Sequence, residues 1–278
     1  MKKIFYIVRY SVFNHSNAWN LSKELVNVED YKAALFEKRR LDLKFELFSK
    51  LTLPSVTTQV REESDCNYEV IVLTSDELPT KHMNDLVSLK QDMPFTILPV
   101  ERNQNYARVC SQYIHEQFAE AGTDRVYATV RLDDDDILAN NYEARLRKYL
   151  HSLNFDYIVT FPLGLESYIV SSTDGYRVEN TLDINFKKIA LGLAHIGFYR
   201  SSENSFKSKT IHIYQTGNHT KVDERFNVIY DMTPKVYLRV SYDMQDTKGV
   251  GYRKRLSQAR SVPPEEVKQA FPLFAQYM

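Results

Sequence analysis

Cysteine is nearly absent from this chain of 278 residues, which contains only Cys66 and Cys110. Two cysteines so far apart fit neither a disulfide framework nor a zinc or redox motif, so we expect both to be reduced and structural. A long hydrophobic run is absent as well, because Arg9 and Asn14 interrupt the apolar N-terminus too early for a membrane span or a signal peptide. These absences predict a cytoplasmic protein.

A net charge is also missing, since 36 Lys and Arg residues balance 36 Asp and Glu residues. The balance predicts no nucleic-acid partner, so any anion must be bound by a local patch of cations. Hydrophobic residues make up 43% of the chain and charged residues 26%, as in ordinary globular proteins. At this length the chain can bury a large core.

What the chain does contain is a run of four aspartates, Asp133 to Asp136, directly after the β-type segment 126–132 (VYATVRL). Residues two apart in an extended chain share a side, which pairs Asp133 with Asp135 and Asp134 with Asp136. Without a cation, at least one of four adjacent carboxylates should take up a proton. Mg²⁺ or Mn²⁺ removes this conflict and leaves ligand positions for substrate phosphates. A solvated acidic turn before a helix near Asn140 is the alternative.

The first 160 residues alternate between strand-type and helix-type patterns. The expected strands cover 4–8, 68–74, 95–100, 126–132 and 156–161, and the expected helices cover 31–51, 81–91, 106–121 and 142–153. Pro54 is expected to end the first helix region. The alternation predicts an α/β fold with a mostly parallel sheet flanked by helices. Ligands bind at the carboxyl edge of such sheets, which makes Arg9 and Trp19, just past the first strand, candidates for a nucleotide site.

Beyond Pro162 the regular alternation fades, and short apolar patches lie between scattered glycines. We expect a mixed sheet and loops that complete the cleft of a single domain, 1–278, ending in a helix at 263–278. The stretch 248–255 (KGVGYRKR) and Arg260 contribute five basic residues without an acid among them. Such a stretch can close over a diphosphate, touch anionic lipid or form a solvated loop.

These features together resemble the GT-A type of nucleotide-sugar glycosyltransferase, whose Asp-x-Asp motif binds a divalent metal and the donor diphosphate. The stretch 103–109 (NQNYARV) is similar to the segment that faces the donor in many such enzymes. The stretches 40–48 (RLDLKFELF), 53–59 (LPSVTTQ) and 131–136 (RLDDDD) resemble the bacterial family labelled putative rhamnosyltransferase. The resemblance covers roughly the first 160 residues.

The resemblance implies a GT-A-like, Rossmann-like fold and a Mn²⁺ or Mg²⁺ cofactor. It divides the domain into a nucleotide-sugar-binding half, 1–160, an acceptor-side half, 161–262, and the C-terminal helix. Asp133 and Asp135 are the preferred metal ligands, because the first Asp of the family pattern directly follows the hydrophobic strand residue. The implied donor-binding residues are Arg9, Tyr106, Arg108, Arg131, Asp133 and Asp134.

The stretch 211–224 (IHIYQTGNHTKVDE) gathers further polar candidates. Enzymes of the resembling type often take a histidine metal ligand from the C-terminal half, and His219, expected on a loop after Gly217, is the predicted third ligand. An inverting transfer needs a base near the acceptor hydroxyl, for which Asp223 or Glu224 is the candidate. A surface loop with ordinary charges is the alternative. His195 lies in an apolar, glycine-flanked segment, either as a core histidine or near an acceptor.

The expected function is transfer of a sugar, with rhamnose suggested by the family's name, from a nucleoside-diphosphate donor to a glycan or lipid-linked glycan hydroxyl. We expect a role in bacterial surface polysaccharide synthesis and peripheral contact with the inner face of the plasma membrane. One alternative is a haloacid-dehalogenase-type phosphohydrolase, although its Asp-x-Asp normally follows the first strand. The other is a structural Ca²⁺ site in a sugar-binding module, but Leu138 and Ala144 at the sixth and twelfth positions exclude an EF-hand.

Overall fold

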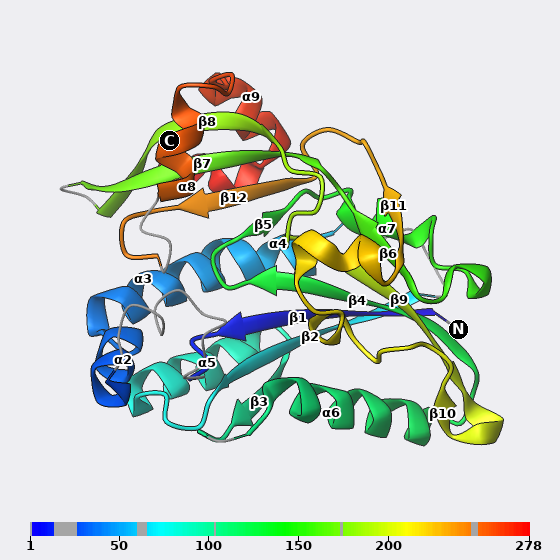
Figure 1. The fold of residues 1–278 in the computed structure, drawn as a ribbon. Coiled ribbons are helices and arrows are strands. Elements are labelled where there is room, and N and C mark those ends of the chain that lie inside the picture. The colour runs from blue at the N-terminus through cyan, green and yellow to red at the C-terminus, as the bar shows by residue number, and fades with distance from the viewer. Residues whose placement is uncertain (1, 14–26, 60–65, 103, 173–174, 246–249) are drawn as a thin grey trace.

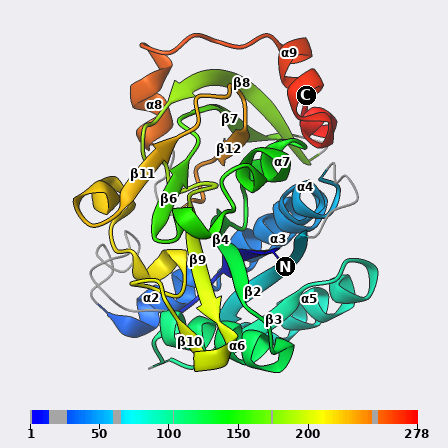
Figure 2. The same cartoon turned by 90° about the vertical axis from the view of Figure 1, so that its right-hand side faces the viewer.

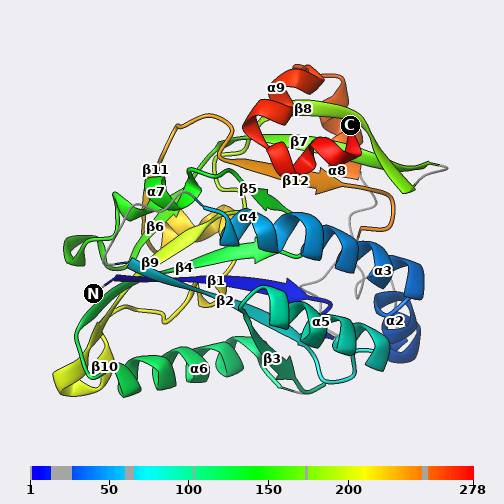
Figure 3. The same ribbon diagram turned by 180° about the vertical axis from the view of Figure 1, so that it is seen from behind.

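The computed structural model describes residues 2–13, 27–59, 66–102, 104–172, 175–245 and 250–278. Trp19 and residues 248–249 of the basic stretch lie outside these ranges. Two sheets lie one above the other, with helix α3 between them (Figure 1 and Figure 3).

The larger sheet confirms the predicted α/β fold. Its strands follow the order β11-β6-β9-β4-β1-β2-β3, with β10 added beside β9. Among the described strands only β9 runs against the others, because it pairs antiparallel with β4, β6 and β10. The strands are β1 Lys2–Tyr10, β2 Cys66–Ser75, β3 Thr96–Val100, β4 Arg125–Asp133, β6 Tyr157–Thr160, β9 Ala194–Arg200, β10 Ser205–Phe206 and β11 Asn227–Tyr230.

The smaller sheet is the mixed sheet expected from the second half of the chain. Its order is β5-β12-β7-β8, with one parallel pair between β12 and β7. The strands are β5 Ile137–Leu138, β7 Leu163–Ser172, β8 Gly175–Asn185 and β12 Tyr237–Ser241. Figure 2 shows this sheet stacked over the larger one, seen along its strands. Because β4 belongs to one sheet and β5 to the other, the four aspartates form the crossing between the two sheets.

The described helices are α2 Val28–Leu35, α3 Lys38–Leu47, α4 Leu53–Thr57, α5 Thr80–Asp92, α6 Tyr106–Ala121, α7 Tyr142–Arg147, α8 Val250–Leu256 and α9 Pro264–Ala270. Helices α3 to α6 lie on the two faces of the larger sheet, whereas α8 and α9 pack against the smaller sheet. Helix α6 packs Ile114 and Phe118 against Phe5 and Ile7 on one face. Helix α3 has two apolar sides: Leu41 packs on the other face, and Leu43 and Leu47 pack under the smaller sheet.

Three predicted helices differ from the observed ones. The helix predicted at 31–51 is broken after Leu35, where Glu37 caps the start of α3. Pro54 does not end it, because a π-helical turn, Phe48–Thr52, precedes α4 and places the proline in its first turn, where no backbone donor is needed. The helix predicted at 142–153 ends at Arg147 and is followed by a 3-10 turn, Ser152–Asn154. The C-terminal helix is interrupted by Pro272, and a 3-10 segment, Pro272–Tyr277, follows.

Position 197 has no room for a side chain. The ring of Tyr127, its neighbour across the sheet, occupies the space into which a side chain on residue 197 would project. Tyr127 is fully buried and donates a hydrogen bond to the Ile211 carbonyl at 2.8 Å, so the ring has no room to move. We therefore expect Gly197→Ala to lower the free energy of unfolding by about 1–3 kcal/mol, measured by denaturant unfolding. In a Tyr127→Ala background the same change should cost much less, and equal costs would contradict the steric explanation.

Candidate active site

A cavity of about 810 Å³ opens where β1 and β4 end, between the two sheets. Its walls come from both sheets, from α3 and α8, and from the segments 184–191 and 214–219. The charged residues that line it are Arg9, Arg40, Lys44, Arg131, Arg239, Arg255, Asp133, Asp134, Asp135 and Asp136. The carboxyl edge of a parallel sheet is where α/β folds bind ligands, so this cavity is the candidate active site.

Asp133 is the most accessible member of the acidic run, with 36% of its side chain exposed. Its Oδ1 accepts a hydrogen bond from the Arg9 guanidinium at 2.8 Å. Burial by itself would raise the pKa of Asp133, but the charges of Arg9 and Arg131 outweigh it and hold this pKa well below its usual range. Asp133 is therefore an ionised carboxylate on the cavity wall.

The next two aspartates are buried around a lysine. The Lys44 ammonium contacts Asp134 Oδ1 and lies 3.7 Å from Asp135 Oδ2. Asp135 Oδ2 also accepts hydrogen bonds from the Tyr242 hydroxyl at 2.8 Å and from Gln245 Nε2 at 3.0 Å. Burial raises the pKa of Asp134 to about 6, although Lys44 opposes the shift. These two carboxylates are held by the protein itself.

Asp136 completes the run with a buried carboxyl group. Burial and the neighbouring charges of Asp135 and Asp133 raise the pKa of Asp136 well above its usual value. This agrees with the expectation that one of four adjacent carboxylates takes up a proton. Two hydrogen bonds connect the backbone after Asp136 to α4 and to the residue that follows this helix. The Leu138 amide donates to Ser55 Oγ at 3.2 Å, and Gln59 Nε2 donates to the Ala139 carbonyl at 2.9 Å.

Tyr214 also lines the cavity. The guanidinium carbons of Arg9 and Arg131 lie 5.0 and 5.3 Å from the centre of its ring. The ring of Tyr106, at the start of α6, meets Tyr214 edge-on with centres 5.8 Å apart. Cations lie favourably against an aromatic ring, so Tyr214 stabilises two guanidinium groups of the cavity lining.

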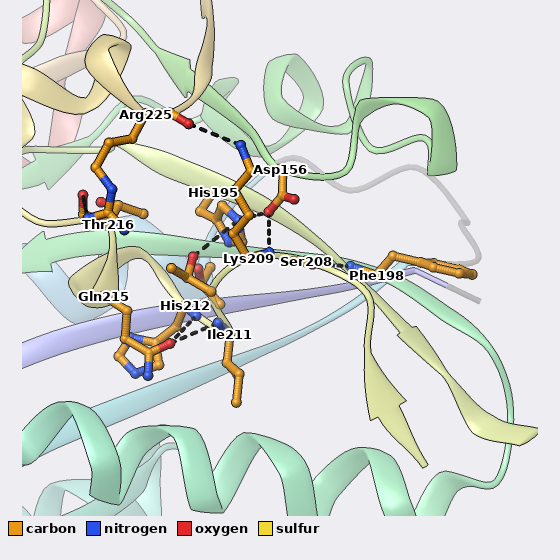
Figure 4. A network of polar contacts seen from close by, with 12 residues as sticks. Asp156, His195, Phe198, Ser208, Lys209, Ile211, His212, Gln215, Thr216 and Arg225 are labelled. Atoms are coloured by element: carbon orange, nitrogen blue, oxygen red, sulfur yellow. Dashed lines mark hydrogen bonds and ion pairs between the residues drawn. The ribbon is translucent and has the colours of Figure 1, made fainter. Parts of the chain in front are cut away.

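A buried polar network fixes the segment that carries Tyr214 (Figure 4). His212 bonds through Nε2 to the Ala107 carbonyl at 2.8 Å, and Gln215 Oε1 accepts from the Ile211 amide at 2.8 Å. Burial lowers the pKa of His212 to about 4, so its ring is neutral. Nearby, His195 is fully buried, with Nε2 3.5 Å from Asp156 Oδ1 (Figure 4). Of its two predicted placements, the structure therefore shows the core histidine.

The structure brings most of the predicted site residues together. Those that line the cavity are Arg9, Tyr106, Arg131, Asp133, Asp134, Asp135 and His219. Arg108 does not line it and is exposed, because two residues along a helix turn the side chain away from the direction of Tyr106.

The predicted base candidates are not brought to the cavity either. Asp223 pairs with Lys188 at 2.6 Å, and Glu224 is exposed beside Lys221 at 3.9 Å. Both belong to a 3-10 segment, His219–Glu224, of which only His219 reaches the cavity wall.

Other lining residues were not singled out from the sequence as site residues. Lys44, Tyr214, Arg239 and Gln245 come from separate elements, and no spacing links them to the aspartates. Tyr214 lies inside the polar stretch 211–224 and Lys44 inside the family-like stretch 40–48, and these stretches were the available signals. Arg255 belongs to the basic stretch, which forms α8 where it is described, and its guanidinium forms two hydrogen bonds with the buried Glu166 carboxylate at 2.6 and 2.7 Å.

The residues present fit a divalent cation of the magnesium type. Within the described ranges, the hydrogen bonds to Asp133 and Asp135 each use one carboxylate oxygen, which leaves the other for a metal. His219 bonds through Nδ1 to the Lys188 carbonyl at 2.6 Å, and burial lowers its pKa, so its other nitrogen can be a ligand. No three His, Cys, Asp or Glu side chains of the described residues already converge as a complete metal cluster. Such a cation would therefore take its remaining ligands from water and substrate.

The cavity and its charges define a class: an α/β protein with a charged cavity at the carboxyl edge of its larger sheet. A family model described as putative rhamnosyl transferase matches residues 3–254. The chain belongs to this glycosyltransferase family, as its motifs indicated. A search of curated proteins finds no significant match.

Solved structures of two glycosyltransferases have a similar chain course. Staphylococcus aureus TarS 1–349 is 7% identical with a TM-score of 0.44, over 88% of this chain and 62% of that one. The chain thus spans less than two thirds of the TarS structure. The mannosyltransferase PcManGT of Pyrobaculum calidifontis, solved with GDP-Man and Mn²⁺, is 12% identical with a TM-score of 0.34, over 99% of this chain and 69% of that one. Among the described residues, no helix has the length and hydrophobicity needed to cross a membrane.

Proposed function

We propose that this protein transfers a sugar, rhamnose or a related hexose, from a nucleoside-diphosphate donor to a hydroxyl of a glycan or lipid-linked glycan. Family membership supports the reaction class. The observation that carries the proposal is the meeting of Asp133, Arg9 and Arg131 in one cavity at the sheet edge. Two guanidinium groups beside an ionised carboxylate suit a diphosphate with its metal ion.

The proposed metal site consists of Asp133 and Asp135, with His219 as the candidate third ligand. Mn²⁺ or Mg²⁺ held there would neutralise charge on the departing nucleoside diphosphate. Arg9 and Arg131 would bind the same phosphates and orient the donor, and the walls from both sheets would limit access of water. For Asp223 or Glu224 to serve as base, the segment 219–224 would have to carry them toward the cavity. The inverting course and this base remain predictions.

We also propose that the acceptor belongs to a bacterial surface polysaccharide under assembly at the inner face of the plasma membrane. The smaller sheet supplies the acceptor side of the cavity in this proposal, through Phe186 after β8 and Arg239 on β12. Phe186 is 41% exposed, which suits a ring that stacks on a sugar.

The test is the thermal stability of the protein with UDP, GDP, dTDP and CMP, each with Mn²⁺ present. A ligand that binds only the folded state raises stability by RT ln(1 + [L]/Kd), about 2.7 kcal/mol at a hundredfold excess over Kd. We expect one diphosphate to raise the melting temperature clearly more than the other nucleotides. No shift with any nucleotide contradicts the proposal, and release of phosphate from a simple phosphate monoester would favour the hydrolase alternative.

A further inference from the structure

Lys44 places a cation inside the acidic run before any metal binds. It extends from α3, the helix between the two sheets, and only 8% of the residue is exposed. Its ammonium contacts Asp134 Oδ1 and lies 3.7 Å from Asp135 Oδ2. A buried ammonium is stable only when paired, and the same is true of the two carboxylates, so each group holds the others in place.

The cavity as a whole has more positive than negative charge. Six arginine and lysine side chains line it, against four carboxyl groups. Arg9 offsets the charge of Asp133, and Lys44 offsets one of the two charges carried by Asp134 and Asp135. Among the described residues, Arg131 has a buried Nε without a hydrogen-bond partner, and Arg239 has its nearest acidic partner, Glu166, at 3.8 Å. Both residues line the cavity, so their guanidinium groups can contribute positive charge toward a bound anion.

We infer that Lys44 is a built-in counter-ion of the acidic run, through which the cavity binds a nucleoside diphosphate without a divalent cation. The inference rests on the proposed function and refines it: the metal ion is required for transfer but not for binding of the donor. Where carboxylates lack a counter-ion, a metal must neutralise them before a diphosphate can approach. Here the Lys44 ammonium already places one positive charge between two of them, and Arg9, Arg131 and Arg239 line the cavity in which the phosphates would bind.

A substitution at Lys44 can distinguish its role as a counter-ion from a role in packing alone. Lys44→Met keeps an unbranched side chain of similar length but removes the charge, which leaves Asp134 and Asp135 uncompensated beside the cavity. A divalent cation can restore the lost charge. The variant should therefore bind the diphosphate only when metal is added, whereas a purely structural lysine would leave the metal requirement unchanged.

The experiment measures the dissociation constant of the best-binding nucleoside diphosphate by calorimetry, in EDTA and in Mn²⁺. For the wild-type protein we expect less than a threefold difference between the two conditions. For Lys44→Met we expect binding at least tenfold weaker in EDTA and near the wild-type value in Mn²⁺. Lys38→Met is the matched control, because Lys38 lies on the same helix with 76% of its side chain exposed and pairs with Asp42. It should behave as the wild type.

Each outcome decides between the two proposals. Wild-type binding in Mn²⁺ but not in EDTA overturns the inference and leaves the proposed function standing. Absence of binding in both conditions sinks the proposed function itself. Equal binding of Lys44→Met in both conditions assigns the lysine a structural role only. If that variant does not fold, the wild-type comparison still decides, and Lys44→Arg, which keeps the charge, should retain binding in EDTA.

Discussion

Replacing Asp133 by asparagine should slow sugar transfer at least 100-fold while the protein stays folded. Asp133 is the ionised, accessible carboxylate of the acidic run and the partner of Arg9 in the cavity. An amide of the same shape keeps the packing but loses the charge that would hold the metal ion, and losses of this kind cost catalysis factors of about 10²–10³. Initial rates with a labelled donor, together with the melting temperature, measure both halves of this expectation.

Asp183→Asn is the matched control for that experiment. Asp183 is also an aspartate paired with an arginine, Arg260, and 37% of its side chain is exposed, nearly the same fraction as for Asp133. It does not line the cavity. Its replacement should change the rate less than twofold, and an Asp133 variant that kept near wild-type rates would refute the assignment of the metal site.

Replacing Glu166 by alanine should lower the free energy of unfolding more than any other substitution proposed for this protein. Glu166 lies on β7 with none of its surface exposed, and it accepts hydrogen bonds from Arg255 and from Ser241 Oγ at 2.8 Å. Its loss leaves the Arg255 guanidinium partly buried without a counter-ion. Breaking a buried pair in this way costs about 3–5 kcal/mol, which corresponds to a fall in melting temperature of roughly 5–9 °C for a chain of this size.

Calorimetry of two further variants tests the reason for this loss. Glu265→Ala removes a glutamate that is 85% exposed and pairs only with Lys268 at 3.2 Å among the described residues, so its melting temperature should not change measurably. Glu166→Ala combined with Arg255→Met removes both charges and should recover part of the lost stability. A double variant less stable than Glu166→Ala would argue against the unpaired arginine as the cause.

The larger sheet could be predicted from the sequence because its strands are marked locally. Apolar runs at 4–8 and 68–74 alternate with helical patterns, and this alternation defines a parallel sheet whatever the distant contacts are. The pairing of β12 with β7 and with β5 could not be predicted in the same way. It joins segments about 70 and 100 residues apart, and only the packed structure brings them together.

The residues of the candidate site likewise fall into those that the local sequence marks and those that only the fold brings together. The aspartates were found because four consecutive carboxylates at a strand end are visible in one dimension, and Arg9 and Arg131 were found beside strand ends. Lys44 and Tyr214 complete the site from other elements, and nothing in their local sequence marks them as neighbours of Asp133. Arg108 shows the opposite effect, since it is near Tyr106 in sequence but on a different side of α6.

The π-helical turn at Phe48–Thr52 changes the direction in which side chains project along the continuous helical segment formed by α3 and α4. A π turn holds one residue more than an α turn, so side chains beyond it are rotated relative to those before it. Before the turn, Lys44 meets the carboxylates; after it, Ser55 and the end of α4 meet the backbone that follows them. A homologue that had lost one residue from this turn could keep the helix. However, Lys44 and Ser55 could no longer both contact the acidic run and the backbone that follows it.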